Sequence, residues 1–247
     1  QNISLMLNLA KAYLYNKERG PAEETYKKIL EINASVGEAL IGLGDIATGN
    51  KEYSKADRFY ARLVELEPRS PVGYHKRGIV KQIEKKDKDA IAFYEKALES
   101  NIDYAPAFTS LIDVYMRDKK IDLAIKRAQL QITKSPKNPT YYVMLAKLYT
   151  AARDVANARK TYEKVLEMYP NYQEGIMGLA QFEQSQGNFD KALGHYQKLK
   201  EMQPESLEVQ IYIAMALEQK GDIPKARTAY EEMLKKLLLT LALAGVI

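Results

Sequence analysis

The stretch Ala158 to Pro170, ARKTYEKVLEMYP, decides the fold because its alanine, tyrosine and proline recur at a fixed interval. The same alanine returns at a constant interval of about 34 residues, at Ala22, Ala56, Ala90, Ala124, Ala158, Ala192 and Ala226. Self-similarity at such a period is the signature of a repeat array, in which each unit cannot bury its own apolar face and needs its neighbours to cover it. We therefore expect stacked units rather than separate globular domains.

Seven such units account for nearly all of the 247 residues, so we expect no separate catalytic domain among them. The expected repeats are residues 3–36, 37–70, 71–104, 105–138, 139–172, 173–206 and 207–240, which together form one solenoid over 1–240. An apolar C-terminal tail comes after them at 241–247.

Two amphipathic helices are expected in each unit, because apolar residues recur every three or four positions in two blocks. In the sixth repeat the blocks contain Ile176 and Leu179, then Leu193 and Tyr196. Pairs of turn-forming residues separate the blocks at Gly49-Asn50, Arg153-Asp154, Gly187-Asn188 and Gly221-Asp222. Prolines that stop the second helix come next, at Pro68, Pro136, Pro170 and Pro204.

The residue types at three unit positions favour close packing of the two helices. Position 8 is small in six repeats (Ala10, Gly44, Gly78, Ala146, Ala180 and Ala214), and position 20 is alanine in all seven. Tyrosine occupies position 24 in six repeats: Tyr26, Tyr60, Tyr94, Tyr162, Tyr196 and Tyr230. We expect the small residues to let the backbones approach and the tyrosines to fill the core above the crossing.

This pattern resembles the tetratricopeptide repeat family over essentially the whole chain. The fifth repeat carries the resemblance best, with Tyr142, Leu145, Ala146, Tyr149, Ala158, Tyr162 and Pro170 in the family's positions and Val165 where a small residue is usual. The resemblance implies an all-α fold, a right-handed superhelical solenoid of antiparallel helix pairs. It also implies that the first helices line a concave groove that binds a peptide or a helix.

The fourth repeat departs from the pattern, with Ile112 at position 8, Ala128 at position 24 and Gln131 at position 27. A larger residue on one helix and a smaller one on the other preserve the total volume, which cores tolerate better than an unbalanced change. We interpret the exchange as compensated.

Neither catalysis nor a cofactor or metal site is expected. The chain has no cysteine, and its two histidines, His75 and His195, fall in different repeats. Gly42, Gly44 and Ala47 match a dinucleotide-binding spacing, but that motif needs a preceding strand, whereas these residues lie inside an expected helix. Helix packing explains them better.

The resemblance places unit positions 2, 5, 6, 9 and 12 of each first helix on the groove. The candidate protein-binding residues are Asn8, Lys11, Ile41, Asp45, His75, Lys76, Ile79, Thr109, Asp113, Met116, Val143, Met144, Lys147, Met177, Gln181, Ile211, Tyr212 and Met215. Four of the eight methionines are among them, and methionine suits a surface that adapts to an apolar ligand. The alternative is that these methionines fill gaps between neighbouring repeats.

A basic band in the fourth and fifth repeats accounts for much of the formal net charge of +5. It consists of Arg117, Lys119, Lys120, Lys126, Arg127, Lys134, Lys147, Arg153, Arg159 and Lys160. Three interpretations stay open: a solvated face, a site for an acidic protein, and a site for nucleic acid. Most of these residues fall at turns or on second helices, which the resemblance implies are turned away from the groove or lie at its rim.

The C-terminal end is unusually apolar for the last unit of an array, whose outer face is normally polar. Leu234, Leu237, Leu238 and Leu241 form a stripe that a capping helix could bury, and further apolar residues continue to Ile247. Self-association, a truncated following element and the beginning of a membrane segment are the alternatives, in that order. We expect the chain as given to be soluble, in the cytoplasm or the periplasm, with membrane attachment only if the tail continues in a longer protein. Because the chain begins at Gln1 without a methionine, we expect an excised segment.

These observations predict a non-catalytic scaffold or adaptor that binds a protein segment, extended or helical, in the groove and organises a multiprotein assembly. One alternative is a regulatory arm excised from a larger enzyme or from a membrane-anchored envelope protein. The other is nucleic-acid binding through the basic band.

Overall fold

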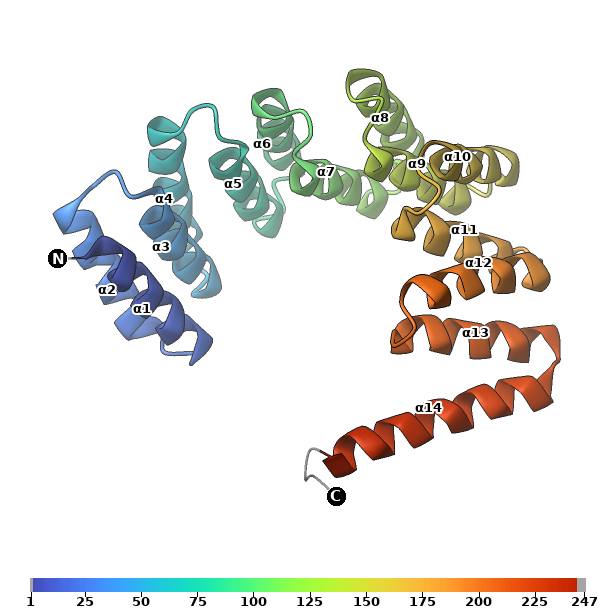
Figure 1. Cartoon of the computed structure of the whole chain (residues 1–247). Helices are drawn as coiled ribbons and strands as arrows, with labels where there is room; N and C mark the ends of the chain where they lie inside the picture. The colour runs from blue at the N-terminus through green and yellow to red at the C-terminus, as the bar shows by residue number, and fades with distance from the viewer. Residues whose placement is uncertain (1, 244–247) are drawn as a thin grey trace. The chain divides into compact units, whose positions relative to one another are not determined.

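The computed structural model describes residues 2–243, and every regular element in this range is an α-helix. Figure 1 shows the order of the fourteen helices of these residues. Their bounds are α1 Ile3–Tyr15, α2 Arg19–Ile32, α3 Gly37–Gly49, α4 Tyr53–Leu66, α5 Pro71–Ile83, α6 Asp87–Ser100, α7 Ala105–Arg117, α8 Ile121–Lys134, α9 Pro139–Ala151, α10 Val155–Met168, α11 Gln173–Ser185, α12 Phe189–Met202, α13 Leu207–Lys220 and α14 Ile223–Leu243. Odd-numbered helices are the first helices of the repeats and even-numbered helices are the second.

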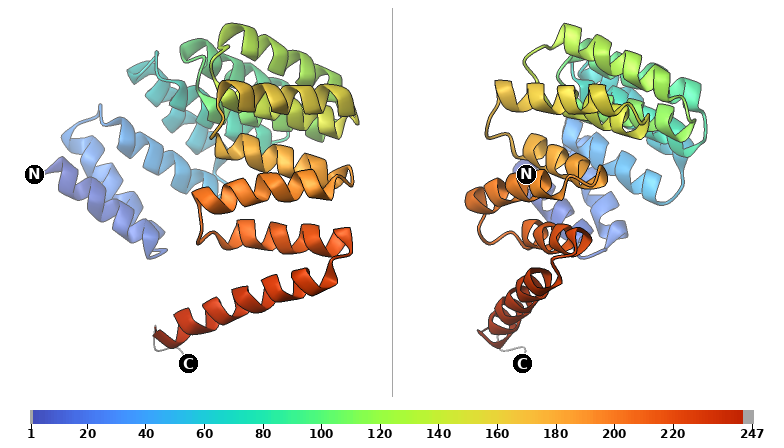
Figure 2. Two further views of the ribbon diagram at one scale, coloured as in Figure 1. Left: turned by 45° about the vertical axis from the view of Figure 1, so that its right-hand side comes forward. Right: turned by 90° about the vertical axis from the view of Figure 1, so that its right-hand side faces the viewer.

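The chain divides into two units, Gln1–Ala124 and Ile125–Ile247, with the boundary inside α8. Helices that are consecutive in sequence pack against each other from α1 to α7 in the first unit and from α9 to α14 in the second, and consecutive first helices also meet, as α5 does with α7 and α9 with α11. Figure 2 shows the second unit, from yellow-green to red, with its successive helices side by side. The prediction of an all-α array of helix pairs is confirmed.

Local chemistry explains where the helices begin and end. Pro71 and Pro139 stand at the start of α5 and α9, where the missing N–H costs nothing because the first helical amides have no partner. Asn138 and Asp154 cap α9 and α10 by accepting hydrogen bonds from the amides of Thr140 and Asn157. The four stop prolines lie two residues beyond the ends of their second helices, as the spacing predicts.

The turn inside each repeat needs one residue with a left-handed backbone. Lys17, Lys51, Lys85, Lys119 and Arg153 adopt it with φ between 59° and 65°, and Gly187 and Gly221 adopt it with φ of 75° and 89°. These seven residues occupy the same unit position. In the second repeat the expected turn at Gly49-Asn50 is therefore wrong in register, since Gly49 ends α3 and Lys51 takes the left-handed conformation.

The packing rule of the sequence describes the core well. Tyr26, Tyr60, Tyr94, Tyr162 and Tyr196 are at most 3% exposed, which confirms five of the six tyrosines at position 24 as core. A Cβ added to Gly44 would lie 2.4 Å from the ring of Tyr60 of the same repeat, and one added to Gly178 would lie 2.5 Å from the ring of Tyr162 of the preceding repeat. Each tyrosine thus fills the space between its own first helix and the next one.

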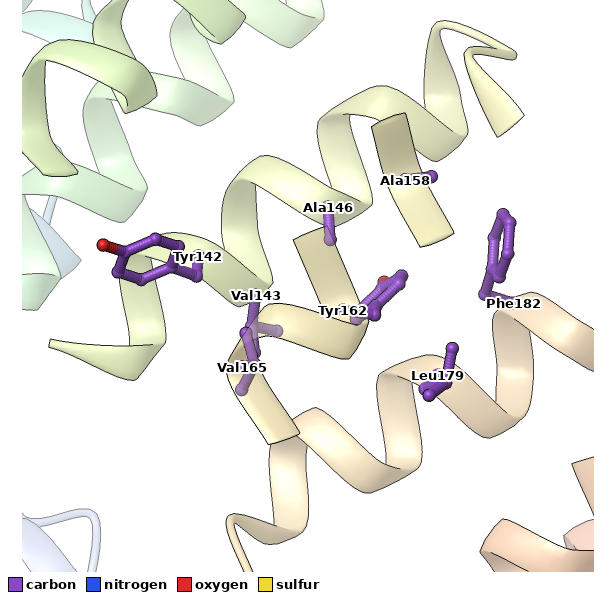
Figure 3. Packing of buried hydrophobic residues seen from close by; sticks show 8 residues of the cluster. All are labelled: Tyr142, Val143, Ala146, Ala158, Tyr162, Val165, Leu179 and Phe182. Atoms are coloured by element: carbon purple, nitrogen blue, oxygen red, sulfur yellow. The ribbon is translucent and has the colours of Figure 1, made fainter. Parts of the chain in front are cut away.

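Figure 3 shows this arrangement around Tyr162. Ala146 of α9, Ala158 of α10 and Phe182 of α11 belong to the same buried cluster, and the rings of Tyr162 and Phe182 have centroids 5.9 Å apart. Val165 is fully buried in the same cluster, so the larger residue in place of the usual small one is accommodated by the core.

Tyr230 is the exception, because it is 39% exposed. It lies on α14, the last helix of the described chain, where no following first helix covers its ring. Its assignment to the core is therefore wrong, and the physical reason is that part of each buried tyrosine's packing surface comes from the next repeat.

The apolar stripe on α14 is not buried as a capping helix would bury it. Leu234, Leu237 and Leu238 are 57%, 46% and 47% exposed. The helix continues through Leu243, so the first part of the expected tail extends α14, while the side chain of Leu241 and residues 244–247 lie outside the described part of the chain. No helix among the described residues is both long enough and apolar enough to span a membrane.

The fourth repeat is buried at all three unusual positions. Ile112 is 1% exposed, and Ala128 and Gln131 are fully buried. Gln131 is satisfied by Arg127, whose Nη1 donates to its Oε1 at 2.8 Å along one face of α8. The side-chain amide of Gln131, at position 27, is therefore buried with a hydrogen-bond partner.

Candidate protein-binding face

The candidate binding residues lie on the first helices, at unit positions 2, 5, 6, 9 and 12, and we call this set of positions the ligand face. Most of the eighteen candidates keep part of their surface exposed, although helix packing buries the rest of each first helix. Ile211 and Met215, on α13, are 44% and 38% exposed despite their apolar side chains. A row of partly exposed apolar and charged residues along successive helices suits a protein segment.

In the first unit the ligand face is held together by ion pairs from one first helix to the next. Lys11 of α1 pairs with Glu38 of α3, and the Nζ of Lys76 on α5 lies 2.7 Å from Oδ1 of Asp45 on α3. The hydroxyl of Tyr60 donates to the same Oδ1 at 2.6 Å. The sequence placed Lys11, Asp45 and Lys76 on one face, and the structure brings Asp45 and Lys76 together.

His75 sits deeper than a ligand-contacting residue does. It is 8% exposed, and its Nε2 lies 3.0 Å from the hydroxyl of Ser110 on α7 while its Nδ1 lies 3.5 Å from the hydroxyl of Tyr104. Burial, with a smaller contribution from the neighbouring Lys76 ammonium, lowers the pKa of His75 to about 4. His75 therefore joins α5 to α7 as a neutral imidazole at pH 7.

Val143 is also buried, at 5% exposed, in the cluster around Tyr162. Its side chain faces the core of the second unit, so its placement on the ligand face is corrected by the packing. Tyr212 is half-buried because its ring stacks on that of Tyr196, with centroids 5.5 Å apart and planes 7° apart. This stack covers part of the surface that the sequence assigned to a ligand.

In the second unit, three candidates line one cavity of about 260 Å³. They are Lys147 of α9 and Met177 and Gln181 of α11. The rest of the wall comes from α11, α12 and α13 and includes Gly178, Leu199, Val209 and the carboxylates of Glu174 and Glu208. A cavity of about 150 Å³ holds a benzene ring, so this one has room for a large apolar side chain.

Four residues of the ligand face were missed by sequence reasoning: Glu38, Ser110, Glu174 and Glu208. Three of them, the glutamates, occupy unit position 2, which the resemblance already assigned to the groove. A signal was therefore present in the recurrence of glutamate at that position. Ser110 occupies unit position 6, which the resemblance also assigned to the groove, but its hydrogen bond with His75 depends on a residue of the neighbouring first helix and could not be read from the position alone.

The basic band is partly neutralised by acids of the same unit. Arg117 pairs with Asp87 in the first unit. Arg159 pairs with Glu183 in the second unit while its guanidinium lies over the ring of Phe182. Charges engaged in this way are less available to the phosphates of a nucleic acid.

The described residues also give no support to a metal site. Among them, no group of three or more histidine, aspartate or glutamate side chains could hold a metal ion.

The fold defines a class of protein: a helical repeat protein whose successive first helices carry a row of partly exposed side chains. The sequence models of the tetratricopeptide repeat match residues 3–36, 143–206 and 177–237, which is more than half of the chain. The chain belongs to the tetratricopeptide repeat family, whose members generally act as scaffolds for protein–protein interaction.

Individual relatives are distant. A tetratricopeptide repeat protein of Methanocaldococcus jannaschii is 24% identical over 157 residues, which cover 62% of this chain and 27% of the relative. A protein O-mannosyl-transferase of Homo sapiens is 25% identical over 179 residues, which cover 70% of this chain and 20% of the relative. The matched segment thus spans between a fifth and about a quarter of the length of these relatives.

Among solved structures, the yeast protein Tom70 superposes with a TM-score of 0.70 at 21% identity, over 99% of this chain and 55% of that chain. At this identity the likeness describes the fold of both proteins and nothing of their ligands.

Proposed function

We propose that the chain is a non-catalytic scaffold that binds a segment of another protein on its ligand face and thereby organises a multiprotein assembly. The observation that carries the proposal is the partial exposure of apolar residues there, Met177, Ile211 and Met215 above all, on helices whose other faces are buried. Apolar side chains left open to water beside charged ones are what a protein interface uses.

Binding of short peptides tests the proposal directly. A displayed library of random twelve-residue peptides is selected on the full chain and on a variant that carries Met144→Ser, Met177→Ser and Met215→Ser. We expect enriched peptides on the wild type and at least a tenfold loss of their affinity on the triple variant, measured by fluorescence anisotropy.

The matched control changes three exposed residues of second helices, Lys28→Ser, Glu65→Ser and Glu163→Ser, and keeps binding intact. Thermal melting separates the two interpretations of the methionines. An unchanged melting midpoint with lost binding supports a ligand contact. A lower midpoint in the methionine variant alone shows that these residues fill gaps between repeats and contradicts their role in binding.

A second candidate is that the chain acts as the arm of a larger protein, positioning other domains of the same polypeptide. The observation in its favour is that the matched segment forms only 20% of the human protein O-mannosyl-transferase. An arm of this kind holds its target in cis, whereas a scaffold binds it in trans. Cross-linking of the full-length protein followed by mass spectrometry distinguishes the two by where residues of the ligand face are linked.

A further inference from the structure

The cavity around Met177 has a floor that belongs to the core of the second unit. Leu199 and Val209 are 1% and 2% exposed, and Met177 packs against the same cluster while remaining partly exposed. Gly178 adds no side chain to the wall. A Cβ at this position would collide with the ring of Tyr162. The result is a hollow with an apolar base and one adaptable methionine at its edge, and with a polar wall in which Gln173, Gln203 and Ser206 join Glu174, Gln181 and Glu208.

One ion pair of the first unit gives a register for the charges around this hollow. Lys11, at position 9 of the first repeat, pairs with Glu38, at position 2 of the second. The same two positions bring Lys147 of the fifth repeat toward Glu174 of the sixth, and both line the hollow. Lys147 is therefore in register with Glu174, although the two form no ion pair among the described residues.

Glu208 differs from Glu38 and Glu174, because no lysine is in register with it. It occupies position 2 of the seventh repeat, and the residue in register with it, at position 9 of the sixth, is the neutral Gln181. Glu208 is exposed and has no ion-pair partner among the residues that the structure describes. Its place in the first turn of α13 favours a negative charge but leaves its oxygens free to accept from a ligand.

We infer that this hollow is the anchor subsite for the bound segment, and that it takes one aromatic or branched aliphatic side chain flanked by a lysine or arginine whose cation pairs with Glu208. The inference rests on the proposed function and adds the chemistry of the partner. The hollow contributes affinity by taking an apolar side chain of the partner out of water, because aromatic and branched side chains that fill a pocket dominate the binding energy of an interface. The carboxylate of Glu208 makes the site prefer a positively charged residue beside the anchor side chain of the partner.

Three variants of the full chain test the pairing of charges against the same peptide library. Glu208→Gln removes the carboxylate, and Gln181→Lys supplies from within the chain the cation that Glu208 lacks, as Lys11 does for Glu38. Each is expected to weaken the peptides enriched on the wild type by at least tenfold. Glu174→Gln is the matched control, since its carboxylate already has Lys147 in register, and it is expected to change the affinity less than threefold.

The sequences of the enriched peptides give an independent measurement. We expect one aromatic or branched aliphatic residue with a lysine or arginine within two positions, and we expect Glu208→Lys to select an acidic residue in place of the basic one. Unchanged melting midpoints show that each variant is folded.

The experiment distinguishes an error in the anchor subsite from an error in the proposed scaffold function. Peptides that bind the wild type without this pair of residues, or that bind Glu208→Gln and Gln181→Lys unchanged, overturn the subsite and leave the proposed function standing. A library from which nothing is enriched on the wild-type chain overturns both.

Discussion

The residue with a left-handed backbone in each turn shows how one position affects the stability of the fold. Gly187 has φ of 75° and nothing within 4 Å of a Cβ built on it, so its only requirement is conformational. At five equivalent positions lysine or arginine accepts the same conformation. A side chain there costs free energy, because Cβ approaches the backbone oxygen in the left-handed region.

Two glycine substitutions in the sixth repeat are expected to change stability in opposite directions. Gly187→Ala lowers the free energy of unfolding by about 1 kcal/mol, because alanine is strained at positive φ. Gly194→Ala raises it by about 0.5–1 kcal/mol, because Gly194 lies within α12 with open space around it. Chemical denaturation measures both, and equal signs for the two variants contradict the conformational argument.

His75 predicts a pH dependence of stability. Its pKa in the folded chain is about 4, below the value of about 6.5 for an exposed histidine. The unfolded chain therefore binds a proton at His75 between these values while the folded chain does not. The contribution of His75 to stability is complete above pH 6.5 and declines by roughly 2–3 kcal/mol as the pH falls to about 4.

Denaturation at a series of pH values with wild type and His75→Gln measures this contribution. We expect the wild type to lose more stability than the variant between pH 6.5 and pH 4. Parallel curves for the two proteins across that window show that His75 is not buried as a neutral imidazole.

At the scale of the helix pair, the same residue has two environments, depending on whether another repeat comes after it. Tyr162 is 3% exposed between its own first helix and α11, whereas Tyr230 is 39% exposed on the last helix of the described chain. The repeat spacing predicted both as core. Periodicity describes an average repeat, and it carries no information on whether a neighbour is present.

Alanine substitution of each tyrosine measures how much the two environments differ in their contribution to stability. Tyr162→Ala is expected to cost about 3–5 kcal/mol, because it opens a cavity in a buried cluster. Tyr230→Ala is expected to cost less than about 1.5 kcal/mol, because its ring already meets water on one side. Thermal or urea denaturation gives both values, and similar losses for the two variants show that another element covers Tyr230 in solution.

At the scale of the whole chain, most of the fold could be predicted from the spacing of a few residues. Alanine at position 20, tyrosine at position 24 and the stop prolines act through short-range packing, so a linear pattern is sufficient to locate them. The ligand face was harder, because it depends on pairs of residues in different repeats. The proposed role of Glu208 depends on Gln181, which stands where the first and fifth repeats have a lysine. Val143 belongs to the buried cluster around Tyr162 and not to the ligand face.

Contacts between neighbouring helices dominate each unit, and this predicts that damage stays local. In the Tyr162→Ala variant, hydrogen exchange is expected to accelerate in α9 to α12, which surround the lost ring, while the amides of α1 to α6 keep their wild-type rates. Exchange measured by mass spectrometry on peptic fragments resolves these segments. A uniform acceleration from α1 to α14 contradicts this prediction and shows that the chain unfolds as one cooperative body.

The exposed ring of Tyr230 also bears on how such chains change length in evolution. The surface that α14 presents around this ring is largely apolar, with Ile223 and Leu234 each 57% exposed beside it. A duplicated repeat would find a matching joint there without any change to the existing core. Copy number can therefore vary in whole repeats by tandem duplication, while the exposed positions of each first helix diverge separately.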